Sequence, residues 1–297
     1  MAVNIMLENH VFIAFDTETT GLSAIACRLV ELSAVKFKLE RDNDGRLVIV
    51  DLGTFSTLID PEQPIPIEVS RIHGITDSMI AGAPTCGQAL DDFLTFIDEP
   101  DAVLMAHNAG FDIEFIRVNC LRLNKPLPAF PVVDTVPLAH KHVNDAANYK
   151  LKTLSEHFGF AGSTYHRALD DSFYVQKLFH RLCIIGDCKS LEDIRQARAI
   201  MSFVAPPAEI CRDGLSQDLQ RFVDTLEIAI ASGESLKLKY DGPYVSTRVI
   251  DPSALIDSRG SLYLSAFCRK VQAERTFGLD RILDLQPNVS HAKTKKR

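Results

Sequence analysis

The sequence predicts an α/β fold with a mixed sheet, followed by a smaller β-rich domain. Strand-like and helix-like runs alternate through about residue 182, which is the pattern of an α/β domain. The first three strand-like runs follow one another, which indicates an antiparallel meander. From about residue 215, one helix is followed by several short strands at close spacing, which is typical of a small β-barrel.

The elements of the first domain are predicted from the period of the apolar residues. Apolar runs bounded by turn residues predict strands over 12–15, 29–39, 47–58, 102–106 and 131–134. Apolar residues spaced by three or four predict helices over 87–97, 110–123, 151–158 and 168–182. We therefore expect residues 1–185 to form one α/β domain.

Residues 186–214 are predicted to be a connection between two domains. Residues 190–201 have helical spacing, and Pro206 and Pro207 follow them as helix breakers. Beyond the connection, residues 217–231 predict an amphipathic helix. Turn signals then separate four expected strands, over 236–240, 247–250, 262–268 and 275–279. These elements predict a second domain over 215–297, which ends in a short basic tail.

Composition argues against several classes of protein. The 297 residues are 46% hydrophobic, enough for more than one packed core, but no apolar run is long enough to span a membrane. No secretory signal is visible, and the seven cysteines form no C-x-x-C pair, which argues against structural zinc and a disulfide framework. We therefore expect a cytoplasmic protein with no membrane partner.

Charge is divided unevenly along the chain. The net charge is −7, yet residues 206–297 carry 14 Lys and Arg against 12 Asp and Glu, so the acidic excess lies in residues 1–205. An acidic first domain does not suit a surface that coats nucleic acid. It is compatible with a site where carboxylates hold metal ions and the metal ions meet a phosphate.

Two carboxylates stand at the end of the first strand-like run. Asp16 and Glu18 follow the mostly apolar residues 11–15, and residues i and i+2 of a strand share a face, so both point the same way. Close like charges repel, and a divalent ion such as Mg²⁺ or Mn²⁺ is the usual remedy. The alternative is a pair of solvated acids in a loop.

Two further segments place acids at the edges of predicted elements. Asp112 falls in the first turn of a helix, where the dipole favours a carboxylate, so helix capping is an alternative role. Asp171 lies five residues after His166 in another helix, and both could be ordinary surface residues. Four carboxylates that converge without a cation would be costly, but with two divalent ions they would form a phosphoryl-transfer site.

These segments resemble the three motifs of the DnaQ-like family, the DEDDh 3′–5′ exonucleases. The matching segments are Phe15–Gly21, His107–Asp112 and His166–Asp171, with Arg71–Thr76, Asp134–Thr135 and Leu151–Leu154 between them. The resemblance covers roughly residues 10–183. It implies a ribonuclease-H-like fold, with a five-stranded mixed sheet flanked by helices.

The resemblance also implies the ligands of two Mg²⁺ or Mn²⁺ ions. Asp16, Glu18 and Asp171 would bind the first ion. Asp16 would bridge to the second, and Asp112 would act directly or through water. The family spacing selects Asp171 rather than its neighbour Asp170 as the last ligand.

His166 would be the general base, because an imidazole titrates near neutral pH. A subtype of the family uses Tyr at the position of Arg167, so the His subtype fits this chain better.

Seven residues are predicted to contact the terminal nucleotide, through backbone groups that hold the 3′-hydroxyl and apolar side chains that stack on bases. They are Thr20, Gly21, Leu22, Ile72, His73, Asn108 and Phe111. Core packing is the alternative for the three apolar side chains, and His73 could simply order its own loop.

Residues 217–285 resemble a WYL domain, a small SH3/Sm-like barrel. The segments that carry the resemblance are Ile228–Ile230, Leu236–Tyr240, Arg248–Pro252, Leu262–Leu264, Ala266–Cys268 and Arg275–Arg281. Leu262 stands where Trp is common in the family. The resemblance implies that a nucleic-acid strand or a charged small ligand binds there. The candidate residues are Arg248, Tyr263, Arg275 and Arg281, with core packing and ion pairing as alternative roles.

Together these observations predict a two-domain, metal-dependent 3′–5′ exonuclease that releases nucleoside 5′-monophosphates from single-stranded 3′ ends. DNA is the favoured substrate, in repair or proofreading, and a DNA polymerase or repair complex is a candidate partner. RNA 3′-end trimming is one alternative. A non-catalytic regulator that senses nucleic acid or a ligand is another, although such a module would not need four acids and His166.

Overall fold

The computed structural model describes residues 6–126, 129–160, 167–203 and 210–288. Two compact units make up the chain. The first contains residues 1–116 and 128–204, and the second contains residues 117–127 and 205–297. The first unit holds a six-stranded sheet and the second a five-stranded sheet.

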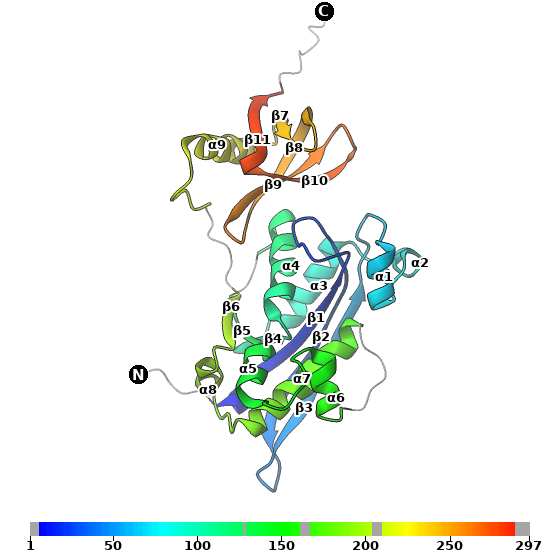
Figure 1. Cartoon of the computed structure of the whole chain (residues 1–297), viewed down its shortest axis with the longest axis vertical. Coiled ribbons are helices and arrows are strands. Elements are labelled where there is room, and N and C mark those ends of the chain that lie inside the picture. Colours follow the sequence, from blue (N-terminus) through cyan, green and yellow to red (C-terminus); the bar gives the residue numbers. More distant parts are fainter. Residues whose placement is uncertain (1–5, 127–128, 161–166, 204–209, 289–297) are drawn as a thin grey trace, which may run out of the picture. The chain divides into compact units, whose positions relative to one another are not determined.

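The sheet of the first unit is mixed and has β1 near its centre (Figure 1). Its strands are β1 (Val11–Thr19), β2 (Leu29–Arg41), β3 (Leu47–Leu58), β4 (Ala102–Ala106), β5 (Phe130–Asp134) and β6 (Ile200–Phe203). The order is β3-β2-β1-β4-β5-β6, with β1 antiparallel to β2 and parallel to β4. The predicted mixed α/β class is confirmed, and β6 joins the five strands that the resemblance implies.

Helices connect and cover these strands. They are η1 (Leu7–Asn9), α1 (Ile67–His73), α2 (Asp77–Ile80), α3 (Cys86–Ile97), α4 (Ala109–Arg122), α5 (Thr135–His142), α6 (Leu151–His157), α7 (Ala168–Ile185) and α8 (Leu191–Gln196). The single helix predicted over 190–201 is wrong, because Arg198 takes a left-handed φ of 56° between α8 and β6. Within the described ranges, no helix is both long and apolar enough to cross a membrane.

The two faces of the sheet pack against different helices. On one face, the ring of Phe12 lies 5.1 Å from Phe179 of α7 and 5.6 Å from Phe37 of β2, centroid to centroid. On the other face, Phe15 lies 6.0 Å from Phe93 of α3. Since side chains alternate along a strand, the even-numbered residues of β1 face α7.

The second unit is a helix followed by an antiparallel sheet. Its elements are α9 (Gln217–Ser232), β7 (Leu236–Asp241), β8 (Val245–Ser258), β9 (Ser261–Cys268), β10 (Ala273–Gly278), η2 (Leu279–Arg281) and β11 (Ile282–Pro287). The sheet order is β10-β9-β8-β7-β11. The strand predicted over 247–250 is longer in the structure, because β8 continues through Asp251 and Pro252 with a register shift before Ala254. Proline is tolerated at such irregularities of a ladder.

Candidate active site

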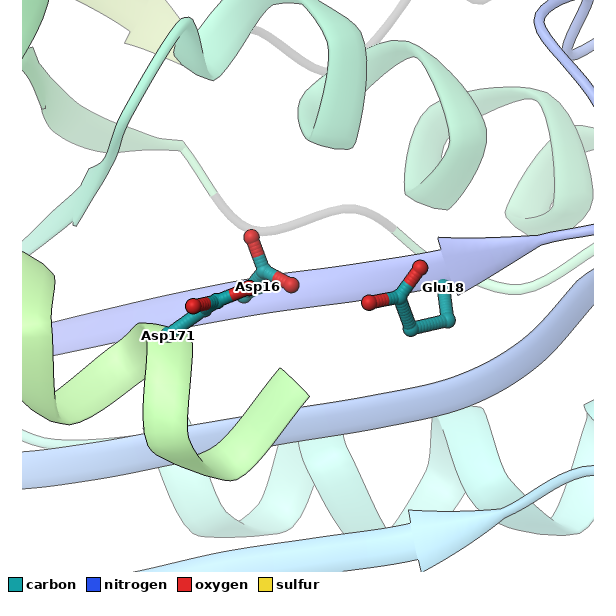
Figure 2. Close-up of side chains that lie close together, drawn as sticks. All are labelled: Asp16, Glu18 and Asp171. Carbon is teal, nitrogen blue, oxygen red and sulfur yellow. The ribbon is translucent and has the colours of Figure 1, made fainter. Parts of the chain in front are cut away.

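Asp16 and Glu18 continue the stripe of β1 that faces α7. Phe12 and Ala14 precede them on the same stripe and belong to the core under α7. Asp171 lies in the first turn of α7, and Figure 2 shows its carboxylate close to that of Asp16, with Glu18 farther along β1. One carboxylate oxygen from each of the three acids lies within 4.8 Å of the others. The structure therefore brings together three of the four predicted acids.

Asp112 reaches the same region from the start of α4. The pairing of β1 with β4 ends at Ala14, so Thr17 has a backbone N–H on that edge that β4 does not use. Thr17 donates this N–H to Asp112 Oδ1 at 3.0 Å and its hydroxyl to the same oxygen at 2.6 Å. The Asp112 side chain is buried, and the two hydrogen bonds from Thr17 fix its position relative to β1.

The pKa values of Asp16, Glu18 and Asp112 are all raised, because these acids are buried close to one another. Burial raises the pKa of Asp16 well above its usual range, and the charges of Asp112, Asp171 and Glu18 raise it further. Burial and then the Asp171 charge raise the pKa of Glu18 to about 8. Burial raises the pKa of Asp112 to about 7, against the opposing effect of the Thr17 hydrogen bonds. Among the described residues, the charge of Arg167 lowers the pKa of Glu18, but burial and the neighbouring acids outweigh it.

A divalent cation fits this set of residues. Hard carboxylate oxygens are the ligands that Mg²⁺ and Mn²⁺ prefer, and a bound cation would remove the repulsion that raises the pKa values. Asp16, Glu18 and Asp171 have the placement to share one ion. Arg167 is a nearby cation, and its charge lowers the pKa of Glu18, but its guanidinium is hydrogen-bonded to Glu31.

Glu31 is a buried carboxylate that the sequence did not single out. It lies on β2 directly opposite Glu18 in the strand register, and 1% of its surface is exposed. Arg167 Nη2 donates to Glu31 Oε1 at 2.7 Å, and the Ala168 N–H donates to Glu31 Oε2 at 3.0 Å. The sequence offers one weak signal, a glutamate within the apolar run that begins at residue 29.

The loop between β4 and α4 is held by the start of α5. Asn108 takes a left-handed φ of 66°, and its N–H donates to Asp134 Oδ1 at 3.0 Å. The same oxygen accepts the N–H of Val136 and so caps α5. The ring of His107 lies between Thr135 Oγ1 and the carbonyl of Tyr149, each at 2.8 Å. Burial lowers the pKa of His107, which indicates a neutral, structural imidazole.

The residues predicted to contact a nucleotide differ in exposure. Leu22 is 87% exposed and Ile72 is 59% exposed, so core packing is not their role. Asn108 is exposed, and Phe111 is half-buried. Thr20 and His73 are buried, and their hydrogen bonds order loops: Thr20 Oγ1 accepts the Arg28 N–H, and His73 Nδ1 accepts the Ile75 N–H.

Gly21 and His166 complete the set of predicted site residues of the first unit. Gly21 has a φ of 154°, and a Cβ there would lie 2.8 Å from Cys27 Sγ, so a larger residue would strain the backbone and displace the Cys27 side chain. His166, the predicted general base, lies outside the described residues, next to Arg167. Its role stays a prediction.

In the second unit, two of the candidate arginines stack on aromatic rings. The Arg248 guanidinium lies 5.9 Å from the centre of the Phe277 ring, and that of Arg281 lies 5.4 Å from the Tyr240 ring. Arg275 is exposed and Tyr263 is half-buried. The two stacked arginines are held by cation–π contacts.

The family of the chain follows from its match to known sequences. The model of the exonuclease family, described as "Exonuclease", matches residues 13–179, which is more than half of the chain. The chain belongs to this exonuclease family. Residues 221–287 match the model of the WYL domain. The predicted membership of an exonuclease family and the predicted WYL domain are thereby confirmed.

Two relatives of the chain are named as DNA polymerase III proteins. The subunit epsilon of DNA polymerase III from Treponema pallidum is 38% identical over 174 residues, which are 58% of this chain and 76% of that protein. The PolC-type DNA polymerase III from Clostridium perfringens is 38% identical over 161 residues, which are 54% of this chain. The match covers only 10% of that PolC-type protein.

The matches among solved structures share little sequence with this chain. Exonuclease X in complex with 5′-overhanging duplex DNA is 21% identical with a TM-score of 0.47, over 63% of this chain and 99% of that chain. Exonuclease I is 12% identical with a TM-score of 0.49, over 87% of this chain and 55% of that chain.

Proposed function

We propose that the protein is a two-metal-ion 3′–5′ exonuclease that releases nucleoside 5′-monophosphates from the 3′ ends of single-stranded DNA. The observation that carries this proposal is the convergence of Asp16, Glu18 and Asp171 within 4.8 Å in a chain of the exonuclease family. The raised pKa of Glu18 supports it, because carboxylates crowded in this way are stabilised when they share a cation.

The acids have separate roles in the proposed reaction. Asp16, Glu18 and Asp171 would hold the first Mg²⁺ or Mn²⁺ ion. Asp16 would also hold the second ion, and Asp112 would act directly or through water. When bound, the two ions activate the attacking water and stabilise the leaving 3′-oxygen. Thr17 keeps Asp112 oriented by two hydrogen bonds.

His166 is the proposed general base of the reaction. It accepts the proton of the attacking water, a role that suits histidine because imidazole groups in general titrate near neutral pH. The exposed side chains of Leu22 and Ile72 are proposed to contact the bases of the terminal nucleotides, because apolar side chains can stack on any base. These contacts would make the enzyme tolerant of sequence.

The relatives favour DNA as substrate and a replication or repair complex as partner, since epsilon and PolC are named as DNA polymerase III proteins. We propose that the WYL domain binds a nucleic-acid strand or a charged ligand through Arg248, Tyr263, Arg275 and Arg281. The stacked arginines at Phe277 and Tyr240 support this, because each keeps a cation in a fixed position.

The proposal is tested with matched DNA and RNA oligonucleotides that carry a 5′ label, with Mg²⁺ or Mn²⁺ in the buffer. We expect stepwise shortening from the 3′ end, faster on DNA, and nucleoside 5′-monophosphates as products. Faster shortening of RNA would reassign the enzyme to RNA trimming. Asp16→Ala should abolish hydrolysis, and His166→Ala should lower the rate while metal binding is kept.

A neighbouring acid provides the matched control. Asp170→Asn changes a carboxylate next to Asp171 in the same helical turn, and we expect it to keep most of the wild-type rate. Degradation that persists unchanged in Asp16→Ala would show that the assigned site is wrong. A normal rate in His166→Ala would reject His166 as the base.

A further inference from the structure

Glu31 is an almost fully buried carboxylate that the proposed reaction does not use. A buried charge is costly unless it is paired and hydrogen-bonded. Glu31 is both, because Arg167 Nε lies 3.2 Å from each of its oxygens, Arg167 Nη2 lies 2.7 Å from Oε1, and the Ala168 N–H lies 3.0 Å from Oε2. The Arg167 guanidinium and the Ala168 N–H thus both bind the Glu31 carboxylate on β2.

These contacts fix the beginning of α7. Ala168 is the first residue of α7, and the side chain of the N-cap residue Arg167 does not cap the helix. Glu31 on β2 provides the cap instead, because its carboxylate accepts the Ala168 N–H. The Asp171 N–H donates to the Arg167 carbonyl at 3.0 Å, which makes Asp171 part of the turn that Glu31 holds. The Ser172 hydroxyl lies 2.7 Å from the Ala168 carbonyl of α7 and 3.3 Å from the Ser33 carbonyl of β2.

Glu31 also decides where the Arg167 charge lies. Arg167 is half-exposed, and a guanidinium at this place has acids on several sides, since its charge acts on Glu18 and the charge of Asp170 acts on it. The geometry with Glu31 is bidentate, which is the strongest form of this pair. While Arg167 is held there, its guanidinium is not available to take the place of a metal ion at Glu18.

We propose that Glu31 is a positioning residue of the exonuclease: it docks the first turn of α7 on β2, so that Asp171 meets Asp16 and Glu18, and it holds Arg167 away from the metal-binding carboxylates. This inference rests on the proposed function, because it assigns Glu31 to the metal site of that reaction. Partners of this kind, which orient the ligands of a metal, typically change metal affinity or activity by about 10- to 100-fold when they are removed.

Two variants of the chain distinguish the effect of the position of the Glu31 carboxylate from the effect of its charge. Glu31→Asp keeps the negative charge but is one methylene shorter, so it cannot reach both Arg167 and Ala168. Glu31→Gln keeps the length but replaces one acceptor oxygen by an NH₂ group, which faces the donors of Arg167 or Ala168. The matched control is Glu99→Gln, which breaks another ion pair of β2, that of Lys36 and Glu99 at 2.7 Å.

The main readout is the affinity for Mn²⁺, measured without substrate by the electron paramagnetic resonance signal of free Mn²⁺, well below the unfolding temperature. We expect both Glu31 variants to bind Mn²⁺ at least about tenfold more weakly, in the range usual for such partners. We also expect kcat on an oligo(dT) substrate to fall by a similar factor with little change in KM. Glu99→Gln should match the wild type in both measurements.

Glu31→Asp decides the outcome, and it does so even if Glu31→Gln does not fold. A folded Glu31→Asp protein with wild-type Mn²⁺ affinity and kcat would overturn the inference, and a loss of thermal stability alone would also count against it. If the wild-type chain shortens no oligonucleotide, the proposed function fails, whereas the Mn²⁺ measurement still judges the role of Glu31.

Discussion

Thr17 donates two hydrogen bonds to one oxygen of Asp112, from its backbone N–H at 3.0 Å and from its hydroxyl at 2.6 Å. Because a hydrogen bond to the ionised form favours that form, the Thr17 hydroxyl holds down the pKa of Asp112, which burial raises to about 7. In Thr17→Val we therefore expect the pKa of Asp112 to rise further. The measurement is a carbon-13 NMR titration of the aspartate carboxyl groups without metal.

The same variant should lower the rate of hydrolysis. A hydrogen bond to a charged group contributes about 1.5–3 kcal/mol, so kcat at neutral pH should fall roughly tenfold or more. Thr57→Val is the control, since the Thr57 hydroxyl donates to the carbonyl of Leu58 on β3. An unchanged Asp112 titration in Thr17→Val would contradict the role given to the hydroxyl.

Stability without metal should fall as pH rises. The pKa of Glu18 is about 8 in the folded chain against an ordinary value of 4.5. Between these values the folded state keeps a proton that the unfolded state has lost, so the free energy of unfolding decreases with increasing pH. The contribution is fully present below about pH 4.5 and is lost as pH passes 8. We expect the thermal unfolding midpoint in EDTA to drop over this window.

Glu18→Gln should reduce this dependence on pH, because glutamine does not titrate. Asp170→Asn should leave the slope close to that of the wild type. Addition of Mn²⁺ should weaken or reverse the slope, since a metal ion binds the ionised carboxylates. A wild-type midpoint that is independent of pH in EDTA would show that the acids are not crowded in solution.

Gly21→Ala should damage activity more than stability. The new Cβ would meet Cys27 Sγ at 2.8 Å, and the φ of 154° is one that side chains other than glycine rarely adopt, at a cost of roughly 1–3 kcal/mol. The loop after β1 should shift, and kcat/KM on oligo(dT) should fall. The double variant with Cys27→Ala should recover part of the loss, because the sulfur is removed while the backbone strain stays.

Gly45→Ala provides the control for backbone strain alone. Gly45 has a φ of 76° in the turn before β3, and nothing lies within 4 Å of an added Cβ. We expect a lower unfolding midpoint and an unchanged kcat/KM. Equal effects of the two substitutions on kcat/KM would refute the link between Gly21 and the site.

Arginines of the WYL domain should contribute to binding of single strands. Arg275→Ala and Arg281→Ala, each in the Asp16→Ala background, should weaken binding of a labelled oligo(dT), measured by fluorescence anisotropy. Each arginine that neutralises a phosphate should reduce the slope of log affinity against log salt by about 1. Arg269→Ala is the control, because Arg269 is bound to Asp251 at 2.8 Å. Equal binding by all variants would indicate that the domain binds another ligand.

The sequence predicted the parts of the site that are local. Asp16 and Glu18 share a strand face because side chains alternate, and Asp171 stands in the first turn of a helix whose apolar period is clear. The roles of Thr17 and Glu31 were not predicted, because their partners Asp112 and Arg167 lie 95 and 136 positions away in the sequence. A threonine in a strand carries no sign of such a partner, and neither does a glutamate.

In the fold too, the sequence predicted the elements with a clear local pattern and missed the others. Long periodic helices such as α3, α7 and α9 were predicted close to their observed ends. The short α1 and α5 were missed, because two turns of helix give too little period to recognise. The strand β6 was missed because the left-handed φ at Arg198, which ends α8, depends on tertiary context that a periodic pattern does not carry.

The docking of α7 on β2 also bears on the order in which the parts of the site are synthesised. Asp16 is synthesised before Arg167 and Asp171, which lie 151 and 155 positions later in the sequence. A nascent chain that ends before α7 carries Asp16 and Glu18 on β1 but lacks Asp171. We therefore expect a fragment that ends before α7 to show no exonuclease activity, because the proposed metal site would be incomplete.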